Sequence, residues 1–191
     1  MDMFVDLETS GFSPENNNII ELALRCDGKN FSTYLNPDKI SWGKGTLEFH
    51  QKNIPDILER IRNGMNDLQL EEMLCLYLKT LGVSNFSDVS KIRLIAHNGN
   101  LFDFKFIKKH KVLSKYFLLE KCETFDTLEY LKKSDLGKSL GKGRSLSEVA
   151  EKLEVKVKEA ELHSADYDTE LLEEVFMELK RKDADIGNTK R

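Results

Sequence analysis

The chain has 191 residues, of which 40% are hydrophobic and 32% charged, and its formal net charge at pH 7 is −4. This balance predicts one folded domain and excludes a disordered chain or a protein that holds nucleic acid mainly through bulk positive charge. The sequence has no uncharged run of about 18 residues, so no membrane span is predicted. The N-terminus lacks the pattern of a secretory signal.

The three cysteines, Cys26, Cys75 and Cys122, lie far apart and form neither a CxxC pair nor a zinc-type spacing. We interpret them as free thiols rather than a disulfide or zinc site. This predicts an intracellular, reducing compartment, either cytoplasmic or nuclear.

The first half of the chain predicts three strands and then helices. Extended, apolar-rich segments lie at residues 3–7, 19–25 and 30–35, and Asp27-Gly28 between the last two is typical of a hairpin. Residues 40–65 predict a loop followed by one short helix. Residues 68–81 have helical periodicity that stops before Gly82.

The second half predicts alternating strands and helices. Residues 92–96 and 122–125 are expected to be strands, and 101–111, 145–153 and 165–181 helices. Asp126 and Thr127 predict the cap of a short helix after the second of these strands. Alternation after an opening hairpin is typical of an α/β fold with one central mixed sheet. We assign residues 1–182 to one domain and 183–191 to a polar, flexible tail.

Two carboxylates stand at the end of the first predicted strand. Asp6 and Glu8 are two residues apart, so they point to the same face as Phe4. Two like charges this close repel unless a cation lies between them, and the carboxyl ends of strands favour ligand sites. The alternative is a solvated strand end followed by a turn.

Asp103 lies on the apolar stripe of its predicted helix, because Phe106, Ile107 and His110 fall within about 60° of it. An unpaired acid there would be costly. The alternative is that Asp103 only stabilises the first helical turn through the helix dipole.

The last predicted helix offers a choice between two acids. Asp168 shares a face with the apolar residues Leu171, Leu172, Val175 and Leu179, whereas Asp166 falls about 160° away. Asp168 is therefore predicted to face inward, and Asp166 to interact with the helix dipole. Three segments thus direct carboxylates toward the core, which predicts hard divalent cations, Mg²⁺ or Mn²⁺, rather than a structural zinc site.

His163 precedes Asp168 by five residues and is a candidate general base for a metal-activated water, although a lone histidine is more often structural or exposed. We interpret the other three histidines as structural: His50 in an apolar-flanked turn, His97 at a strand end and His110 on a helix face.

The segments DLETSG, AHNGNLFD and HSADYD resemble, in this order, the three motifs of the DnaQ-like, or DEDDh, 3′→5′ exonuclease family. Similarity to the family extends over about residues 3–180, through NNIIELAL, ETFDTLEYL and SLSEVAEKLEV. The resemblance implies a ribonuclease H-like fold with a five-stranded mixed sheet flanked by helices. It also implies two metal ions and stepwise release of nucleoside monophosphates from a 3′ end.

The resemblance also implies the roles of single residues. Those matching the family's metal ligands are Asp6, Glu8, Asp103 and Asp168, with His163 as the base. Those expected at the terminal nucleotide are Leu7, Thr9, Gly11, Phe12 and Asn98. The chain departs from the family after His50, where Gln51, Lys52 and Asn53 replace a His-Gly-Ile-Thr-like stretch, so substrate preference is not carried over.

The expected substrate is a single-stranded 3′ end, with DNA slightly favoured over RNA. Residues 132–145 carry five Lys or Arg against one Asp, and this predicted basic loop either follows upstream phosphates or is simply solvated. The alternatives are a short-RNA exoribonuclease, an inactive nucleic-acid-binding domain of the same fold and a phosphatase of small nucleotides. A homodimer and a polymerase or repair partner both remain open.

Overall fold

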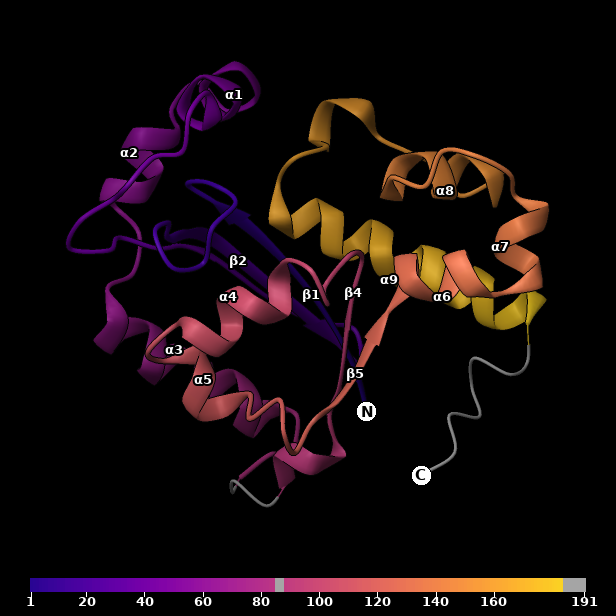
Figure 1. Ribbon diagram of the computed structural model, residues 1–191. Helices are drawn as coiled ribbons and strands as arrows, with labels where there is room; N and C mark the ends of the chain where they lie inside the picture. The colour runs from indigo at the N-terminus through magenta and orange to yellow at the C-terminus, as the bar shows by residue number, and fades with distance from the viewer. Residues whose placement is uncertain (85–87, 184–191) are drawn as a thin grey trace.

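The centre of the fold is a five-stranded sheet (Figure 1). The structure, a computed structural model, describes residues 1–84 and 88–183. The strands are β1 (Asp2–Thr9), β2 (Ile19–Cys26), β3 (Lys29–Tyr34), β4 (Arg93–Ala96) and β5 (Glu123–Asp126), in the spatial order β3-β2-β1-β4-β5. The first three strands pair antiparallel, whereas β4 and β5 run parallel to β1. The predicted mixed sheet is confirmed.

The hairpin between β2 and β3 turns at Asp27 and Gly28, as predicted. Their φ angles of 49° and 72° are both positive, which is the requirement of a tight two-residue turn of type I′. The turn fixes the register between β2 and β3. The pairing of β2 with β1, on its other side, places Glu21 opposite Glu8 at the candidate site.

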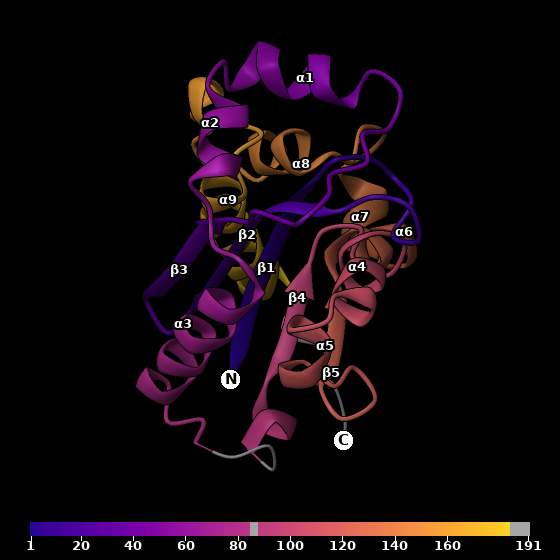
Figure 2. The same cartoon turned by 90° about the vertical axis from the view of Figure 1, so that its left-hand side faces the viewer.

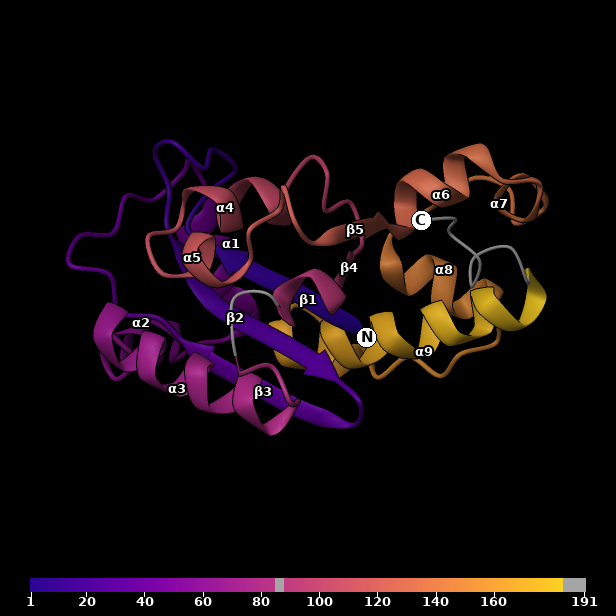
Figure 3. The same ribbon diagram turned by 90° about the horizontal axis from the view of Figure 1, so that it is seen from below.

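Helices cover both faces of the sheet, as Figure 3 shows from below. On one face lie α3 (Asp67–Thr80), α4 (Asp103–Lys109) and α5 (Leu113–Tyr116); on the other lie α8 (Leu146–Lys152) and α9 (Ala165–Lys182). Strand β1 serves both cores, since Met3, Val5 and Leu7 belong to the first, and the Phe4 ring lies 5.5 Å from that of Phe176 in the second. The chain is thus a three-layer α/β fold.

Residues 40–65 differ from the prediction of one short helix, because they form two: α1 (Thr46–Asn53) and α2 (Ile57–Arg62). Ile57 and Ile61 pack against Ile20 in a third, small core. Figure 2 shows α1 lying across the top of the molecule, beyond the end of β1. With only two buried residues in each helix, the apolar pattern was too short to reveal them.

The predicted basic loop at residues 132–145 is partly wrong. Its first half is helical, because α6 (Thr127–Lys133) is followed at once by α7 (Asp135–Ser139), and only residues 140–145 form a loop. Ser134 caps α7 by accepting a hydrogen bond of 3.0 Å from the Gly137 N–H. A Cβ at Gly137 would lie 1.8 Å from the Leu131 carbonyl oxygen, so this tight helix–helix turn requires glycine.

The remaining features concern the chain as a whole. Two single 3₁₀ turns, η1 (Asp88–Lys91) and η2 (Glu159–Glu161), precede β4 and α9. Cys26 and Cys122 are buried free thiols, and burial raises the pKa of both to about 11. No helix within the described ranges is long and apolar enough to cross a membrane. Residues 184–191 of the predicted tail lie outside the described residues.

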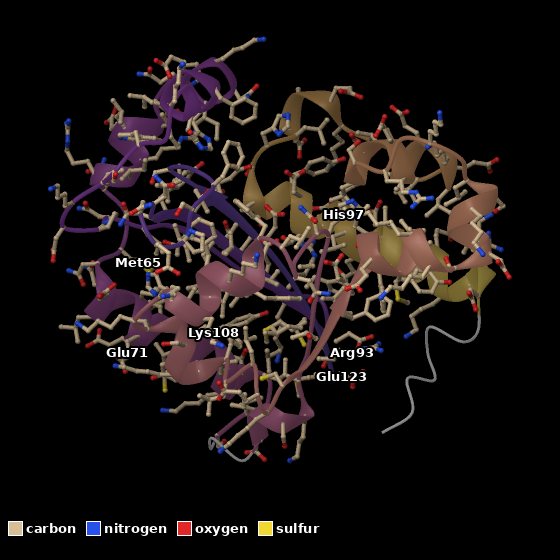
Figure 4. The ribbon with its side chains drawn as sticks, viewed as in Figure 1. Met65, Glu71, Arg93, His97, Lys108 and Glu123 are labelled. Carbon is tan, nitrogen blue, oxygen red and sulfur yellow. The ribbon has the colours of Figure 1, made fainter. Side chains whose placement is uncertain are left out.

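The two ends of β4 differ in chemistry, as the labels in Figure 4 show. At its lower end, Arg93 donates two hydrogen bonds of 2.8 Å to Asp2 and lies 4.0 Å from Glu123. At its upper end, His97 leads into the loop that precedes Asp103. The charged side chains at the lower end are engaged in ion pairs with one another. The candidate site residue Asp103 instead follows the upper end of the strand.

Candidate active site

The first two candidate carboxylates lie at the carboxyl end of β1. Asp6 and Glu8 alternate with Val5 and Leu7, which face the core under α3 and α4. They therefore share the side of Phe4, which packs against α9. Both acids are only partly exposed. The extended period of two thus places both carboxylates on one face at the end of the sheet, as predicted.

The start of α9 brings His163 and Asp168 to this edge. One ligand atom from each of Glu8, His163 and Asp168 lies within 4.8 Å of the others. A carboxylate oxygen of Asp168 also accepts a hydrogen bond of 3.2 Å from the His163 backbone N–H. Asp166 instead accepts a hydrogen bond of 2.5 Å from the side chain of Asn30, away from this group. The helix-phase prediction that Asp168 faces inward agrees with this geometry.

His163 adopts an unusual backbone conformation just before α9. Its φ of 68° lies in the left-handed region, which costs a residue with a Cβ about 1 kcal/mol or more. Its imidazole is exposed and packs edge-on against the Phe49 ring, with 5.1 Å between the ring centroids. The strained backbone and the aromatic contact together hold an accessible imidazole beside two carboxylates.

Asp103 is the first residue of α4 and is almost fully buried, with 3% of its surface exposed. One of its carboxylate oxygens, Oδ1, is buried and has no hydrogen-bond partner among the described residues. Burial raises the pKa of Asp103 to about 7, although hydrogen bonds from its own N–H and that of Leu7 oppose the shift. A buried oxygen without a donor is costly, which makes it a candidate ligand for a cation.

The four predicted carboxylates perturb one another electrostatically. Burial raises the pKa of Asp6 well above its ordinary value, and the charges of Asp103, Asp168 and Glu8 raise it further. The pKa of Glu8 is also raised, by burial and then by Asp168. Burial raises the pKa of Asp168 to about 7. The structure therefore collects the four acids, from three distant segments, into one mutually repelling cluster.

Glu21 on β2 is a fifth carboxylate of this cluster, and sequence reasoning missed it. It is 2% exposed, its pKa is raised by burial, and its Oε2 has no hydrogen-bond partner in the described structure. Its other oxygen accepts a hydrogen bond of 3.3 Å from Ser164, the N-cap residue of α9, which makes no side-chain cap of its own. The available signal was an acid in the buried run IIELAL. Glu21 thus ties β2 to the segment that carries His163.

An apolar hollow of about 380 Å³ adjoins Glu8. It is lined by Leu7, Glu8, Thr9, Phe12, Lys44, Gly45, Thr46, Phe49, His50 and Phe102. Among the residues expected at the terminal nucleotide, Leu7, Thr9 and Phe12 thus line the hollow, whereas Gly11 and Asn98 are not among the residues that do. The Phe12 side chain is 83% exposed, which is unusual for an aromatic residue without a partner surface.

The prediction placed His50 in a turn, and this is wrong. His50 lies inside α1, where it forms part of the wall of this hollow. Its Nε2 donates a hydrogen bond of 2.8 Å to the Thr9 carbonyl oxygen, and its Nδ1 lies 3.8 Å from a Glu8 oxygen. Burial lowers the pKa of His50. The neutral imidazole thus fastens α1 to the end of β1, and the neighbouring Phe49 reaches His163.

The other two histidines bond to the protein, in agreement with a structural interpretation. His97 donates to the Arg144 carbonyl oxygen at 2.7 Å and contacts the Thr127 hydroxyl at 2.8 Å. His110 ends α4, where its Nδ1 accepts from the Val112 N–H at 3.3 Å.

Solved structures define the class to which this fold belongs. E. coli exonuclease I in complex with a dT13 oligonucleotide is 15% identical, with a TM-score of 0.65 over 96% of this chain and 41% of that one. The RNase domain of yeast Pop2 is 15% identical, with a TM-score of 0.67 over 96% and 78% of the two chains. S. pombe Pop2p in its Mg²⁺- and Mn²⁺-bound form is 16% identical, with a TM-score of 0.67 over 96% and 84%. The fold is that of the ribonuclease H-like exonucleases, as predicted.

The family follows from the sequence profile of the exonuclease family (RNase_T), which matches residues 71–176, more than half of the chain. The chain belongs to this exonuclease family, which confirms the predicted resemblance to the DnaQ-like exonucleases. The match includes Asp103, His163 and Asp168, whereas Asp6 and Glu8 precede it. A comparison with curated proteins finds no match. The chain spans about two fifths of exonuclease I.

Proposed function

We propose that this protein is a 3′→5′ exonuclease that hydrolyses phosphodiester bonds at the 3′ end of a single strand and releases nucleoside monophosphates. Membership of the exonuclease family supports hydrolysis of nucleic acid. The observation that carries the proposal is the carboxylate cluster around Asp103, whose buried Oδ1 has no hydrogen-bond donor among the residues that the structure describes. A structural role would have supplied a donor, whereas a cation-binding role leaves that oxygen free.

The cluster fits two divalent ions, Mg²⁺ or Mn²⁺, held by Asp6, Glu8, Asp103 and Asp168. Its donors are carboxylate oxygens, which hard cations prefer, and the raised pKa values reflect repulsion that cations relieve. S. pombe Pop2p was solved with Mg²⁺ and Mn²⁺, and E. coli exonuclease I with a zinc ion and single-stranded DNA, which supports divalent metals in this family. When bound, such ions supply a Lewis acid that stabilises negative charge developing on the phosphate.

His163 is proposed to accept the proton of the attacking water. Its imidazole is accessible, and a ring nitrogen lies within 4.8 Å of carboxylate oxygens of Glu8 and Asp168. These anions stabilise the imidazolium once the proton has arrived, while the Phe49 contact limits the orientation of the ring. A general base of this kind contributes about 10²–10⁴-fold to the rate.

The apolar hollow is proposed to receive the terminal nucleobase. Its volume of about 380 Å³ falls within the usual range for ligand sites, about 300–1,000 Å³. Phe12, Phe49 and Phe102 offer aromatic faces to any base, so recognition there does not depend on sequence. Because Glu8 lines the same hollow, a base seated in it places its phosphate beside the carboxylates. A paired end would first have to be unpaired, which favours single strands.

We propose DNA as the first substrate, with RNA as the competing one. E. coli exonuclease I was solved with DNA oligonucleotides, whereas yeast Pop2 is described as an RNase domain, and both match this fold similarly. Recognition of a 2′-hydroxyl decides between the two. The ranking therefore needs a direct comparison.

The test uses 5′-labelled DNA and RNA of one sequence, each with Mg²⁺, Mn²⁺ or EDTA, on a denaturing gel. We expect a metal-dependent ladder that shortens from the 3′ end, and no product from a circular strand. A 3′-labelled copy should release its label as a mononucleotide in the first step. The Asp6→Ala variant, which loses one proposed ligand, is the matched inactive control. Cleavage of circles, or binding without hydrolysis of either strand, would contradict the proposal.

A further inference from the structure

The loop at residues 140–145, here named the basic loop, is fastened to the body of the protein at three points. The Arg144 carbonyl oxygen accepts the 2.7 Å hydrogen bond from His97. The Lys152 ammonium donates to carbonyl oxygens of Lys142 and Gly143. Ser145 donates its N–H to Glu148 at 3.0 Å in the capping box of α8. A merely solvated loop needs no such anchors, so the structure fixes the path of its backbone.

The anchor at His97 places the basic loop beside the candidate active site. His97 follows β4, next to β1, and begins the segment that ends at Asp103. Asp126 accepts hydrogen bonds of 3.0 Å from the N–H groups of Asn98 and Asn100 in that segment, and its charge raises the pKa of Asp103. The basic loop thus contacts the start of the short segment that leads to Asp103.

Three cations of this region form no ion pair with an acid among the described residues. Among the basic residues at 132–145, Lys133 pairs with Glu129 and Lys138 with Asp135. For Lys132, Lys142 and Arg144, the described residues provide no ion pair. Lys132 and Lys142 are exposed, and Arg144 is half-buried. Lys132 lies in α6, whose first residue, Thr127, contacts His97 through its hydroxyl at 2.8 Å.

These cations complement a phosphate chain that the carboxylates alone would repel. The net charge is −4, and five acids gather where β1 ends and β2 begins. A strand that enters such a site carries one negative charge per nucleotide and gains from fixed positive charge beside its path. A fastened backbone also reduces the entropy lost when Lys142 and Arg144 bind, because only their side chains must be ordered.

We propose that Lys142 and Arg144, supported by Lys132, bind backbone phosphates of the single strand upstream of its 3′-terminal nucleotide. This inference rests on the proposed function and adds the path of the strand outside the hollow. It predicts that the enzyme prefers strands long enough to reach the basic loop. It also predicts a salt dependence of strand binding that the loop cations carry.

The experiment compares the double charge reversal Lys142→Glu/Arg144→Glu with Lys79→Glu/Lys121→Glu, a control in exposed lysines outside this region. Fluorescence anisotropy measures binding of a labelled 15-mer and its dependence on NaCl, and kinetics measure kcat/KM for the 15-mer and for a dinucleotide. We expect the loop variant to bind the 15-mer about tenfold more weakly and to lose about 1.4 from the logarithmic salt slope, two contacts at about 0.7 each. The ratio of kcat/KM for the 15-mer to that for the dinucleotide should fall by a similar factor.

The two proposals fail in distinguishable ways. If the wild-type protein binds the 15-mer through the loop but hydrolyses no strand, the proposed function is contradicted and the loop assignment is retained. Hydrolysis with the salt slope and the length ratio unchanged in the loop variant overturns the loop assignment alone. If the charge reversal unfolds the protein, judged by circular dichroism, the milder Lys142→Gln/Arg144→Gln variant removes the same two contacts and gives the same decision, with the same loss of about 1.4 from the salt slope.

Discussion

Asp103→Asn should stabilise the metal-free protein at neutral pH while destroying its activity. The carboxyl of Asp103 has a pKa of about 7, against an ordinary value of 3.8, because it is buried. Each pKa unit corresponds to about 1.4 kcal/mol, so ionising this group in the folded chain costs about 4 kcal/mol above pH 7. An asparagine amide avoids that cost but leaves buried N–H donors to satisfy, at about 1–3 kcal/mol. The net gain is about 1–3 kcal/mol, roughly 3–9 °C in Tm.

The pH dependence gives the sign of this effect independently. Because the folded state binds the proton more tightly than the unfolded state, the contribution of Asp103 to stability is lost as pH rises from about 4 to about 7. Between pH 5 and pH 8 in EDTA, the wild type should therefore lose about 3 kcal/mol that Asp103→Asn retains.

Thermal melts check both statements. They compare the wild type with Asp103→Asn and with the exposed control Asp38→Asn, each in EDTA and in about 5–10 mM Mg²⁺. Metal should raise the Tm of the wild type and of the control more than that of Asp103→Asn. A lower Tm for Asp103→Asn than for the wild type at pH 8 in EDTA would refute the reasoning, because it would mean that the buried carboxylate is satisfied without a cation.

Substitutions at four further side chains test the site, two of them with a second variant for comparison. Asp168→Asn should lower kcat by at least about 10²-fold, whereas its neighbour Asp166→Asn should stay within about threefold of the wild type, and equal losses would contradict the inward orientation of Asp168. His163→Ala should lower kcat by about 10²–10⁴-fold with metal binding by calorimetry retained; a wild-type rate from pH 6 to 9 would exclude it as the base. Phe12→Ala should weaken binding of the terminal nucleotide by about 1–3 kcal/mol, seen mainly in KM, and an unchanged KM would remove Phe12 from the base site. Glu21→Ala should lower kcat while Glu21→Gln, which keeps an acceptor for Ser164, restores most of it; equal loss in both would assign Glu21 a role through its charge instead.

Patterns within single elements were enough to predict most of the fold. The Asp27-Gly28 turn and the helix phase that separates Asp168 from Asp166 each depend on only a few neighbouring residues, and the structure agrees with both. Helix α4 begins two residues later than predicted, at Asp103, because the preceding residue, Phe102, has a non-helical backbone with φ −130° and ψ −85°. The five-stranded sheet followed from the family resemblance and is confirmed.

Features that depend on the pairing of distant segments could not be predicted in this way. Glu21 belongs to the acid cluster only because the register places it opposite Glu8, and no pattern within IIELALRC specifies that register. Helix α1 was missed because it buries only two residues, Thr46 and His50. The hollow combines β1, the loop at Phe12 and α1, so it exists only after folding. The catalytic and metal-binding roles of the site residues remain predictions.

A single carboxylate joins two segments that are almost thirty residues apart along the chain. Asp126 accepts hydrogen bonds from four backbone N–H groups, those of Asn98 and Asn100 before Asp103 and those of Leu128 and Glu129 at the start of α6. These four amides should therefore exchange their hydrogens with deuterium as one cooperative unit, because opening either segment breaks the shared acceptor. The segment leading to Asp103 thereby gains the protection of a helix start although it lies in a loop.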